Sequence, residues 1–384
     1  MSLSPLSAPV SRRRRGRPRR WIVVLVVIVV LLVAVVAVGA WIGSSILLDP
    51  HHDLVKENVT VKGVAPGRVT LQDTKASKRP GVYGLTFGAG HAIAGSILAQ
   101  GNGTVTRGLS RVTGRLATGT KVAIDPDVYA GDPRQALGVP FQAVAYPDPL
   151  GPMPAWLIPG RSSTWVVFVH GIDGTREAGL RVVPTLRRAG LPILLIDYRN
   201  DAGAPKSPDG LIHLGQTEWQ DVDAAVRWAR TRGAKRIVLY GESMGGAIVT
   251  RFMRESKQAP LVRSMVLDAP ALDWGSIIDG QASRFDVPFM GPPIKWVIGE
   301  RIDFDWDSMN EIAHARDFTI PILLFQGLAD PLVPPADSAA FARKARPGIV
   351  KEQTAPQAGH IQSWNVNPAR YDGALQAFLA RTAR

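Results

Sequence analysis

Residues 236–255, RIVLYGESMGGAIVTRFMRE, decide the fold of this chain. The apolar run from Ile237 to Tyr240 has the length and the β-branched content of a buried strand. A helix-forming run follows from Gly245 to Glu255. Between them lies Gly241-Glu242-Ser243-Met244-Gly245, which has the form G-x-S-x-G and predicts a sharp turn that carries an exposed serine. The stretch therefore predicts a strand, a tight turn and a helix in direct succession.

Apolar and amphipathic segments alternate on both sides of this unit. We expect Phe141–Tyr146 and Met153–Ile158 to pair across a Pro-containing turn. Further strands are predicted at Thr164–Val169, Pro192–Asp197, Val262–Leu267 and Ile320–Phe325, and helices at Arg176–Ala189 and Thr217–Arg232. Such alternation favours a mostly parallel, doubly wound α/β sheet with helices on both faces.

Two residues downstream complete a chemical constellation with Ser243. A serine hydroxyl is a weak nucleophile unless a histidine takes its proton, and that histidine needs an acid to orient it. Asp330 follows the strand Ile320–Phe325, and His360 follows in Ala358-Gly359-His360. Loops at the carboxyl ends of parallel strands meet at one edge of a sheet. We therefore predict Ser243, Asp330 and His360 as the catalytic triad of a serine hydrolase.

A reacting carbonyl also needs preorganised donors for the oxyanion that forms on it. The backbone N–H of Met244, at a helix N-terminus, is one candidate. The backbone N–H of Ile172, in the loop His170-Gly171-Ile172-Asp173-Gly174, is the other. We predict these two groups as the oxyanion hole.

Taken together, these pieces resemble the α/β-hydrolase superfamily, in its peptidase-like and lipase-like serine branch. The resemblance extends from about residue 141 to the C-terminus, and the order Ser, Asp, His is the one associated with this superfamily. It rests on VVFVHGIDG (166–174), LLIDYRN (194–200), EWQDVDAAVRWA (218–229), LYGESMGG (239–246), LLFQGLADPLVP (323–334) and AGH (358–360). It implies an α/β-hydrolase fold and the roles given above, and it implies neither a cofactor nor a metal ion.

Some residues compete for these roles. Asp268 follows the strand Val262–Leu267 and is the reserve candidate for the acid. We favour Asp330 because its Gly-x-x-Asp setting matches the expected acid loop. His170 is interpreted as a structural residue of the oxyanion loop, since His360 already supplies the base. A structural ion pair near the nucleophile is expected from Arg199, Glu218 and Asp221.

Residues 273–317 interrupt the alternation with an aromatic-rich insertion. They form either a lid over the active site or an ordinary helical connection that covers one edge of the sheet. Five tryptophans are candidates for an acyl pocket, although aromatic side chains at such spacings are usually core residues: Trp219, Trp228, Trp274, Trp296 and Trp306.

The sequence from Trp21 to Leu48 contains no charged residue. Its length exceeds the roughly 20 apolar residues that a helix needs to cross a bilayer, and we predict a transmembrane helix at residues 21–45. Trp21 and Trp41 suit the two membrane interfaces. The alternatives are a signal peptide cleaved near Val38-Gly39-Ala40 and a buried core helix.

Seven arginines lie between Arg12 and Arg20, directly before the apolar run. The positive-inside rule predicts a cytoplasmic tail at residues 1–20, a single-pass protein of the cell membrane, and a catalytic domain outside the cytoplasm. These arginines also carry much of the net charge of +13, and the remaining +6 shows no clustering. We therefore expect no nucleic-acid partner.

Residues 51–140 precede the α/β pattern and favour a small β-rich extension. Short β-prone runs occur at Val59–Val64, Arg68–Leu71, Val82–Phe87 and Lys121–Ile124, separated by glycine-rich turns. The extension contains no chemical constellation, and its role is not predicted. The chain has no cysteine, which excludes disulfides and a thiol nucleophile.

The leading hypothesis is hydrolysis of an ester or amide, in a small-molecule, lipid or peptide substrate, through an acyl-enzyme on Ser243. One alternative keeps the same triad but passes the acyl group to an alcohol of the cell envelope, which makes the protein an acyltransferase. Another is a non-catalytic, membrane-tethered binding protein on the hydrolase scaffold. Residues 141–384 carry the α/β-hydrolase domain in all three readings.

Overall fold

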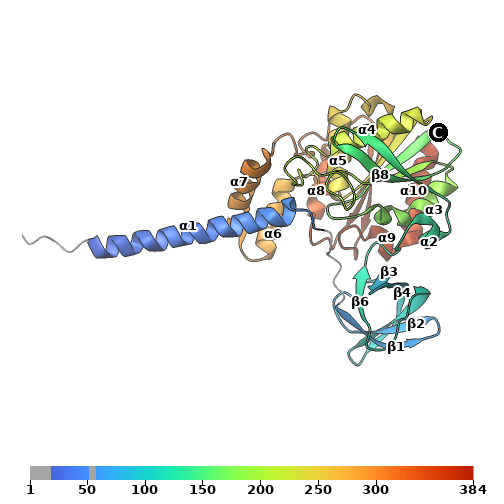
Figure 1. The fold of residues 1–384 in the computed structure, drawn as a ribbon, viewed down its shortest axis with the longest axis horizontal. Coiled ribbons are helices and arrows are strands. Elements are labelled where there is room, and N and C mark those ends of the chain that lie inside the picture. The colour runs from blue at the N-terminus through green and yellow to red at the C-terminus, as the bar shows by residue number, and fades with distance from the viewer. Residues whose placement is uncertain (1–18, 52–57, 384) are drawn as a thin grey trace, which may run out of the picture.

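The computed structural model of the chain describes residues 19–51 and 58–383, with the side chains of Arg19 and Arg20 excepted. It contains a long N-terminal helix, a β-barrel and a larger domain built on one sheet, which we call the sheet domain (Figure 1). The predicted cytoplasmic tail at residues 1–20 lies almost wholly outside the described residues.

An eight-stranded sheet, in the order β14-β13-β12-β11-β9-β10-β8-β7, forms the centre of the sheet domain. Its strands are β7 (Gln142–Asp148), β8 (Gly151–Ile158), β9 (Thr164–Val169), β10 (Ile193–Ile196), β11 (Arg236–Glu242), β12 (Val262–Asp268), β13 (Ile322–Gly327) and β14 (Val350–Ala355). The strands from β9 to β14 run parallel, whereas β8 and β7 are antiparallel to their neighbours. The predicted mostly parallel sheet is therefore confirmed.

Helices cover both faces of this sheet because its central strands are apolar on both sides. In β9, Val167 contributes to the core beneath α4 and α5, and Val166 contributes to the core beneath α3 and α10. The helices of the sheet domain are α3 (Val183–Arg188), α4 (Trp219–Thr231), α5 (Met244–Glu255), α8 (Pro335–Lys344), α9 (Ser363–Val366) and α10 (Pro368–Thr382), and a short α2 (Pro133–Leu137) precedes the sheet.

The single helix predicted over Arg176–Ala189 is wrong in one respect. The structure has a 3₁₀ helix at Arg176–Arg181, followed by α3 from Val183. Pro184 lies in the first turn of α3, where its missing N–H costs nothing, but it cannot continue a preceding helix. The proline therefore divides the segment in two.

The β-rich extension is a closed barrel with the strand order β1-β2-β5-β4-β3-β6. Its strands are β1 (Val59–Ala65), β2 (Arg68–Gln72), β3 (Tyr83–Phe87), β4 (Gly90–Gly101), β5 (Thr104–Thr113) and β6 (Lys121–Asp125). Val61, Leu71 and Leu85 are fully buried in its own apolar core. Closure removes the free strand edges that would otherwise invite pairing with another chain.

The barrel is hydrogen-bonded to the sheet domain at Asn365, in α9. The Asn365 side-chain amide donates to the carbonyl oxygens of Val82 and Pro126, at 2.8 Å each. The backbone N–H of Val82 donates in return to the Asn365 carbonyl at 2.9 Å. The barrel therefore contacts the segment that directly follows His360.

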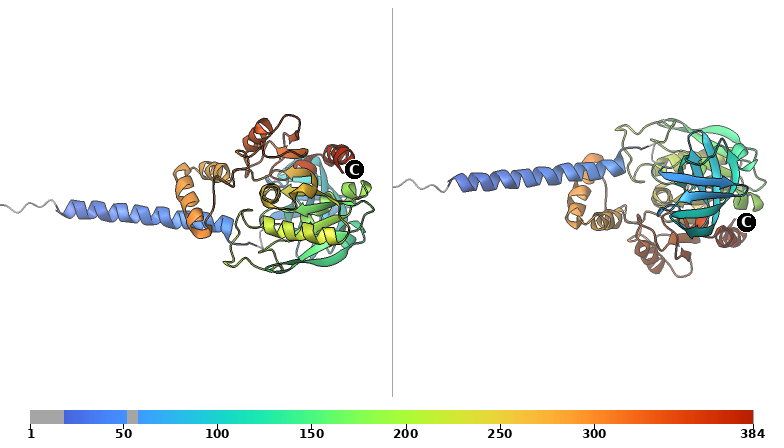
Figure 2. Two further views of the ribbon diagram at one scale, coloured as in Figure 1. Left: turned by 90° about the horizontal axis from the view of Figure 1, so that it is seen from above. Right: turned by 90° about the horizontal axis from the view of Figure 1, so that it is seen from below.

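The N-terminal helix α1 (Arg19–Leu48) projects from the molecule, and only its C-terminal part lies beside other elements (Figures 1 and 2). Its segment Trp21–Leu48 is long and apolar enough to cross a membrane. The side chains from Trp21 to Val35 are exposed, so this part is no core helix. The last residue, Leu48, is fully buried, and its carbonyl accepts a hydrogen bond from Ile212 N–H at 2.8 Å.

Residues 273–317, which we call the cap segment, contain α6 (Trp274–Arg284), a 3₁₀ turn at Pro288–Met290, and α7 (Gly291–Ile302). Both α6 and α7 lie close to the C-terminal part of α1 (Figure 2). Met290 and Val297 of the cap segment form a small apolar cluster with Ala40 of α1.

Candidate active site

Ser243 lies between β11 and α5, on the turn that the motif predicts. Its backbone has φ 53° and ψ −118°, a conformation that L-residues rarely adopt and that stores strain. The flanking glycines permit this turn because neighbouring backbone atoms lie where a side chain at either position would have to be. A Cβ on Gly241 would lie 2.4 Å from the Gly245 carbonyl oxygen, and one on Gly245 would lie 2.2 Å from that of Val169.

The structure brings Ser243, His360 and Asp330 together in one hydrogen-bonded chain. His360 Nε2 lies 2.8 Å from Ser243 Oγ, and His360 Nδ1 lies 2.8 Å from Asp330 Oδ2. The Asp330 side chain is fully buried, and its Oδ1 accepts the N–H groups of Leu332 and Val333 at 2.8 and 3.0 Å. These bonds fix the carboxylate, so the imidazole is held with Nε2 toward the serine.

Asp268, the reserve candidate for the acid, has a different partner. It ends β12, and its Oδ2 accepts a hydrogen bond from the Tyr371 hydroxyl at 2.8 Å. Burial raises the pKa of Asp268 to about 6, although Arg181 opposes this shift. The geometry therefore favours Asp330 as the partner of the histidine.

The two predicted oxyanion donors flank the serine. Met244 is the first residue of α5, so its N–H belongs to the unpaired first turn of a helix. Ile172 lines the cavity above the serine. Gly171 packs so closely that a Cβ there would lie 2.9 Å from Ser243 Cβ, which brings the loop up to the nucleophile. The assignment of both N–H groups as oxyanion donors remains a prediction.

A cavity of about 470 Å³ opens above Ser243 and His360. The cap segment supplies Trp274, Ile277 and Phe285 to its wall, and α1 supplies Ile46 and Leu47. The cap segment therefore contributes to the wall of the cavity at the candidate active site, which favours a lid over an ordinary helical connection.

Only one of the five tryptophans considered from the sequence belongs to this wall, namely Trp274. Trp228 stacks edge-on against Trp165, and Trp306 stacks edge-on against Phe304. Trp296 is exposed on α7.

Arg181 joins the turn around Ser243 to the histidine loop, and sequence reasoning missed it. Its guanidinium donates to the Glu242 carboxylate at 2.9 Å, to the Ile361 carbonyl at 2.9 Å and to Asn365 Oδ1 at 3.1 Å. Arg181 and Glu242 are both buried. Burial raises the pKa of Glu242, although the guanidinium opposes this shift. An arginine in an amphipathic segment gives no sequence signal of such a role.

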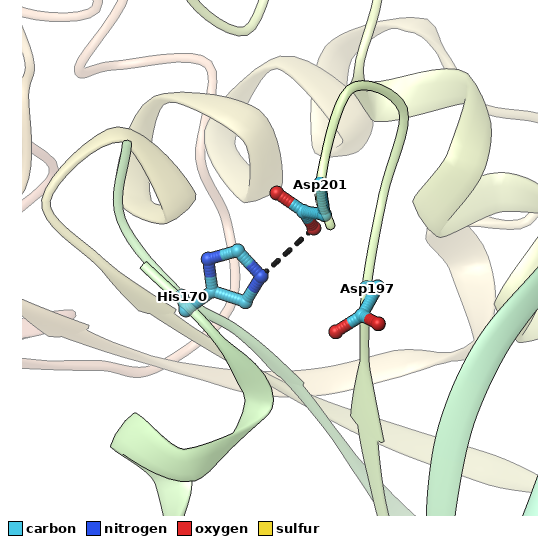
Figure 3. Close-up of side chains that lie close together, drawn as sticks. All are labelled: His170, Asp197 and Asp201. Carbon is cyan, nitrogen blue, oxygen red and sulfur yellow. Dashed lines mark hydrogen bonds and ion pairs between the residues drawn. The ribbon is translucent and has the colours of Figure 1, made fainter. Parts of the chain in front are cut away.

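His170 lies at the end of β9, beside Asp201 and Asp197 (Figure 3). Its Nε2 lies 2.9 Å from Asp201 Oδ2, and its Nδ1 lies 2.8 Å from the Gly171 carbonyl oxygen. Both neighbours are acceptors, so both ring nitrogens donate and the ring is an imidazolium. Burial lowers the pKa of His170, but Asp201 and Asp197 outweigh burial and raise it to about 9.

This cluster has the composition of a metal site, and one potential ligand atom from each of its three side chains lies within 4.8 Å of the others. However, both histidine nitrogens are engaged, and Asp197 pairs with Arg176 at 3.0 Å. The contacts therefore favour a structural role for His170 in holding the oxyanion loop, as the sequence reasoning expected.

The expected ion pair beside the active site involves two of the three predicted residues. Arg199 donates to Asp221 through its guanidinium at 2.6 Å and through its backbone N–H at 2.8 Å. Glu218 instead accepts the backbone N–H groups of His213 and Gly215. It thus stabilises the loop before α4.

Two family models match the chain. Residues 160–310 match serine aminopeptidase, S33, a hydrolase family, and residues 60–125 match a domain of unknown function (DUF8805). The second match falls on the barrel and assigns it no activity.

Curated relatives and solved structures resemble the sheet domain. The uncharacterized protein YfhR of Salmonella typhimurium is 28% identical, over 66% of this chain and 85% of its own. The uncharacterized protein Rv2307c of Mycobacterium tuberculosis is also 28% identical, over 59% of this chain and 75% of its own. The structure of the Pyrococcus furiosus esterase Pf2001 superimposes with a TM-score of 0.54 at 20% identity, covering 66% of this chain and 98% of that one.

The eight-stranded sheet, the strand–serine–helix turn and these similarities define the class of the protein. The chain is a member of the α/β-hydrolase superfamily. More particularly, it is a hydrolase of the α/β fold that carries an apolar N-terminal helix and an additional β-barrel.

Proposed function

We propose that this protein is a membrane-anchored serine hydrolase that cleaves an ester or amide bond through an acyl-enzyme on Ser243. The observation that carries the proposal is the hydrogen-bonded chain from Ser243 through His360 to Asp330, which lies at the base of a cavity. The walls of that cavity are mainly aliphatic and aromatic, and they favour the acyl part of an ester as the bound group.

The proposed reaction has two balanced steps. First, Ser243 Oγ attacks the carbonyl carbon while His360 Nε2 takes the hydroxyl proton. The tetrahedral intermediate then collapses, the bond to the leaving alcohol or amine breaks, and His360 returns the proton to that group. Second, a water molecule gives one proton to His360 and attacks the acyl carbon. The bond from that carbon to Ser243 Oγ then breaks, His360 returns the proton to Oγ, and the carboxylic acid leaves.

The roles of the neighbouring groups follow from their positions. Asp330 keeps the proton of His360 on Nδ1 and stabilises the imidazolium that forms. The N–H groups of Met244 and Ile172 would donate to the oxyanion, and the loss of one such donor typically costs roughly 10²–10³ in kcat.

We further propose that α1 remains attached and spans the membrane, with its N-terminus in the cytoplasm and the sheet domain outside. The small residues at 38–40, which resemble a weak cleavage site, have a structural explanation. A Cβ on Gly39 would lie 3.0 Å from Met290 Cε, and Ala40 is buried against the cap segment. Small residues here let α7 approach the helix, which supports an intact anchor.

The test of the chemistry is labelling of the detergent-solubilised full chain with a fluorophosphonate, beside the variant Ser243→Ala. We expect the wild type to label and to hydrolyse p-nitrophenyl butyrate, and the variant to do neither. An aminoacyl-p-nitroanilide, assayed in parallel, separates esterase from aminopeptidase activity. A wild type that neither labels nor cleaves any of these substrates excludes the proposed function.

The test of the topology is protease treatment of intact cells that express the chain. We expect the sheet domain to be digested from outside while a cytoplasmic marker stays whole. Protection of the sheet domain, under conditions that digest an external control protein, would contradict the proposed orientation.

A further inference from the structure

The membrane helix forms part of the substrate cavity. Gly43, Ile46 and Leu47, all in the last two turns of α1, line the same cavity as Ser243 and His360. A helix that served only as a tether would need no contact with the active site.

The contact between α1 and the cap segment is close and specific. A Cβ on Gly43 would lie 2.7 Å from Ile294 Cδ1, so a larger residue at position 43 would force the Ile294 side chain to move. Arg301, at the end of α7, donates to Ser44 Oγ, Ser45 Oγ and Asp49 Oδ1 at 2.8–3.0 Å. The guanidinium of Arg301 also lies 4.5 Å from the ring centroid of Trp41. These contacts fix the cap segment against the helix.

The same contacts set the depth of the cap segment. With a rise of 1.5 Å per residue, the twenty steps from Trp21 to Trp41 span about 30 Å, which is about the thickness of the hydrocarbon core. Trp41 and Arg301 therefore lie at the outer interface. Met290 packs against Gly39, two residues closer to the bilayer centre than Trp41.

The outer surface of the cap segment carries large apolar side chains. Phe285, Phe289 and Trp296 are 71%, 64% and 68% exposed. Phe285 also lines the cavity. An exposed aromatic surface at the level of a membrane interface indicates that it enters the lipid. One rim of the cavity therefore lies at the membrane.

From these observations we propose that the substrate is a single-chain lipid ester that enters the cavity from the outer leaflet, with its acyl chain held between α1 and the cap segment. The cavity volume of about 470 Å³ is at the lower end of those that hold one drug-sized ligand, and it suits one acyl chain. The inference rests on the proposed function and adds to it the substrate class and the route of entry.

The experiment compares two substrates that share a headgroup, 1-monopalmitoylglycerol and 1-monobutyrylglycerol, with the full chain in lipid nanodiscs. The variant Ile46→Trp fills the part of the cavity contributed by α1. We expect it to lower the ratio of kcat/KM for the palmitoyl over the butyryl ester by about tenfold or more, because an apolar pocket discriminates roughly tenfold or more per misfitted methylene.

The matched control is Ile42→Trp, one turn earlier on α1: the two isoleucines are similarly exposed, at 56% for Ile42 and 63% for Ile46, but only Ile46 lines the cavity. We expect this variant to keep the wild-type ratio. Thermal unfolding of both variants reports whether either change damages the fold.

Each outcome decides the proposal. An unchanged ratio in a folded Ile46→Trp variant, or an equal fall for both esters, overturns the inference while leaving the proposed hydrolase function intact. A wild type that hydrolyses monobutyrylglycerol but not monopalmitoylglycerol also overturns the inference and leaves the proposed hydrolase function intact. A wild type that cleaves neither ester and does not label with fluorophosphonate overturns both proposals.

Discussion

Arg181 Nη1 lies 2.9 Å from the carbonyl oxygen of Ile361, the residue that follows His360. The same guanidinium also donates a hydrogen bond to the carboxylate of Glu242, the residue that directly precedes Ser243. One buried side chain therefore spans the two segments that carry the proposed nucleophile, Ser243, and the proposed base, His360. Ile361 has a positive φ of 49°, which the surrounding bonds must hold in place.

This relationship predicts that Arg181→Lys damages catalysis by misplacing His360. Lysine keeps the charge that Glu242 requires, but it lacks the planar fork that reaches Ile361 and Asn365. We expect kcat for p-nitrophenyl butyrate to fall by about 10- to 100-fold, with KM nearly unchanged, since small misplacements cost up to roughly 10² in rate. A purely structural role would instead lower the unfolding temperature and leave kcat per folded molecule at the wild-type value.

The choice between the two candidate acids predicts a large contrast between two isosteric variants. Asp330→Asn should lower kcat by about 10⁴, because the amide no longer selects the productive tautomer of the histidine. Asp268→Asn should cost less than about tenfold, since its partner is the Tyr371 hydroxyl. Steady-state kinetics on the same ester measure both, and a larger loss in Asp268→Asn would reverse the assignment.

The charged His170 predicts that stability depends on pH. Its pKa is raised from 6.5 to about 9 in the folded chain, so the charged form is favoured by folding. This stabilisation is fully present below about pH 6.5 and is lost as the pH rises through about 9, and it amounts to roughly 3 kcal/mol.

Urea unfolding at several pH values, compared with His170→Gln, isolates this contribution from those of other groups. The stability difference between wild type and variant should shrink between pH 6.5 and 9. A difference that stays constant over this range would mean that the imidazole is neutral in the folded protein.

Arg301 predicts a mechanical link between the cap segment and α1. Arg301→Ala removes three hydrogen bonds and the contact with Trp41, and it should destabilise the cap by about 1–3 kcal/mol. Limited proteolysis of the nanodisc-bound protein should then cut residues 273–317 faster. Lys295→Ala, which loses only a solvent-exposed pair with Asp279, is the control and should cut at the wild-type rate.

The sheet and the alignment of Ser243, Asp330 and His360 could be predicted because their signals are local. The strand before Ser243 is continuously apolar, and the glycines around it are required by contacts shorter than 3 Å. Each candidate follows a strand, and parallel strands bring their carboxyl ends to one edge. Chain order and topology were therefore sufficient.

The barrel was harder to predict because its longest strands are weakly patterned. β4 contains Gly95 and several alanines, which have low β propensity, and β5 is mostly polar. Their pairing is supported by the Asn102-Gly103 turn, where both residues have positive φ. A turn signal was visible in the sequence, but the strands that it joins were not.

The contacts between distant segments could not be predicted at all. Arg181 and Ile361 are 180 residues apart, and Arg301 and Ser44 are 257 apart. No periodicity or motif indicates such a pair, because Arg181 and Arg301 look like ordinary surface residues of amphipathic segments until the fold is known. The contribution of α1 to the cavity lining could not be predicted for the same reason.

The close contact of Gly39 and Gly43 in α1 with the cap segment restricts which sequences can replace α1. Replacing residues 21–48 by an unrelated apolar segment of equal hydropathy would put larger side chains at positions 39 and 43, against Met290 and Ile294. The helix α1 is therefore not interchangeable with another apolar helix, and a version of the protein without it would lack the part of the cavity lining that Gly43, Ile46 and Leu47 provide.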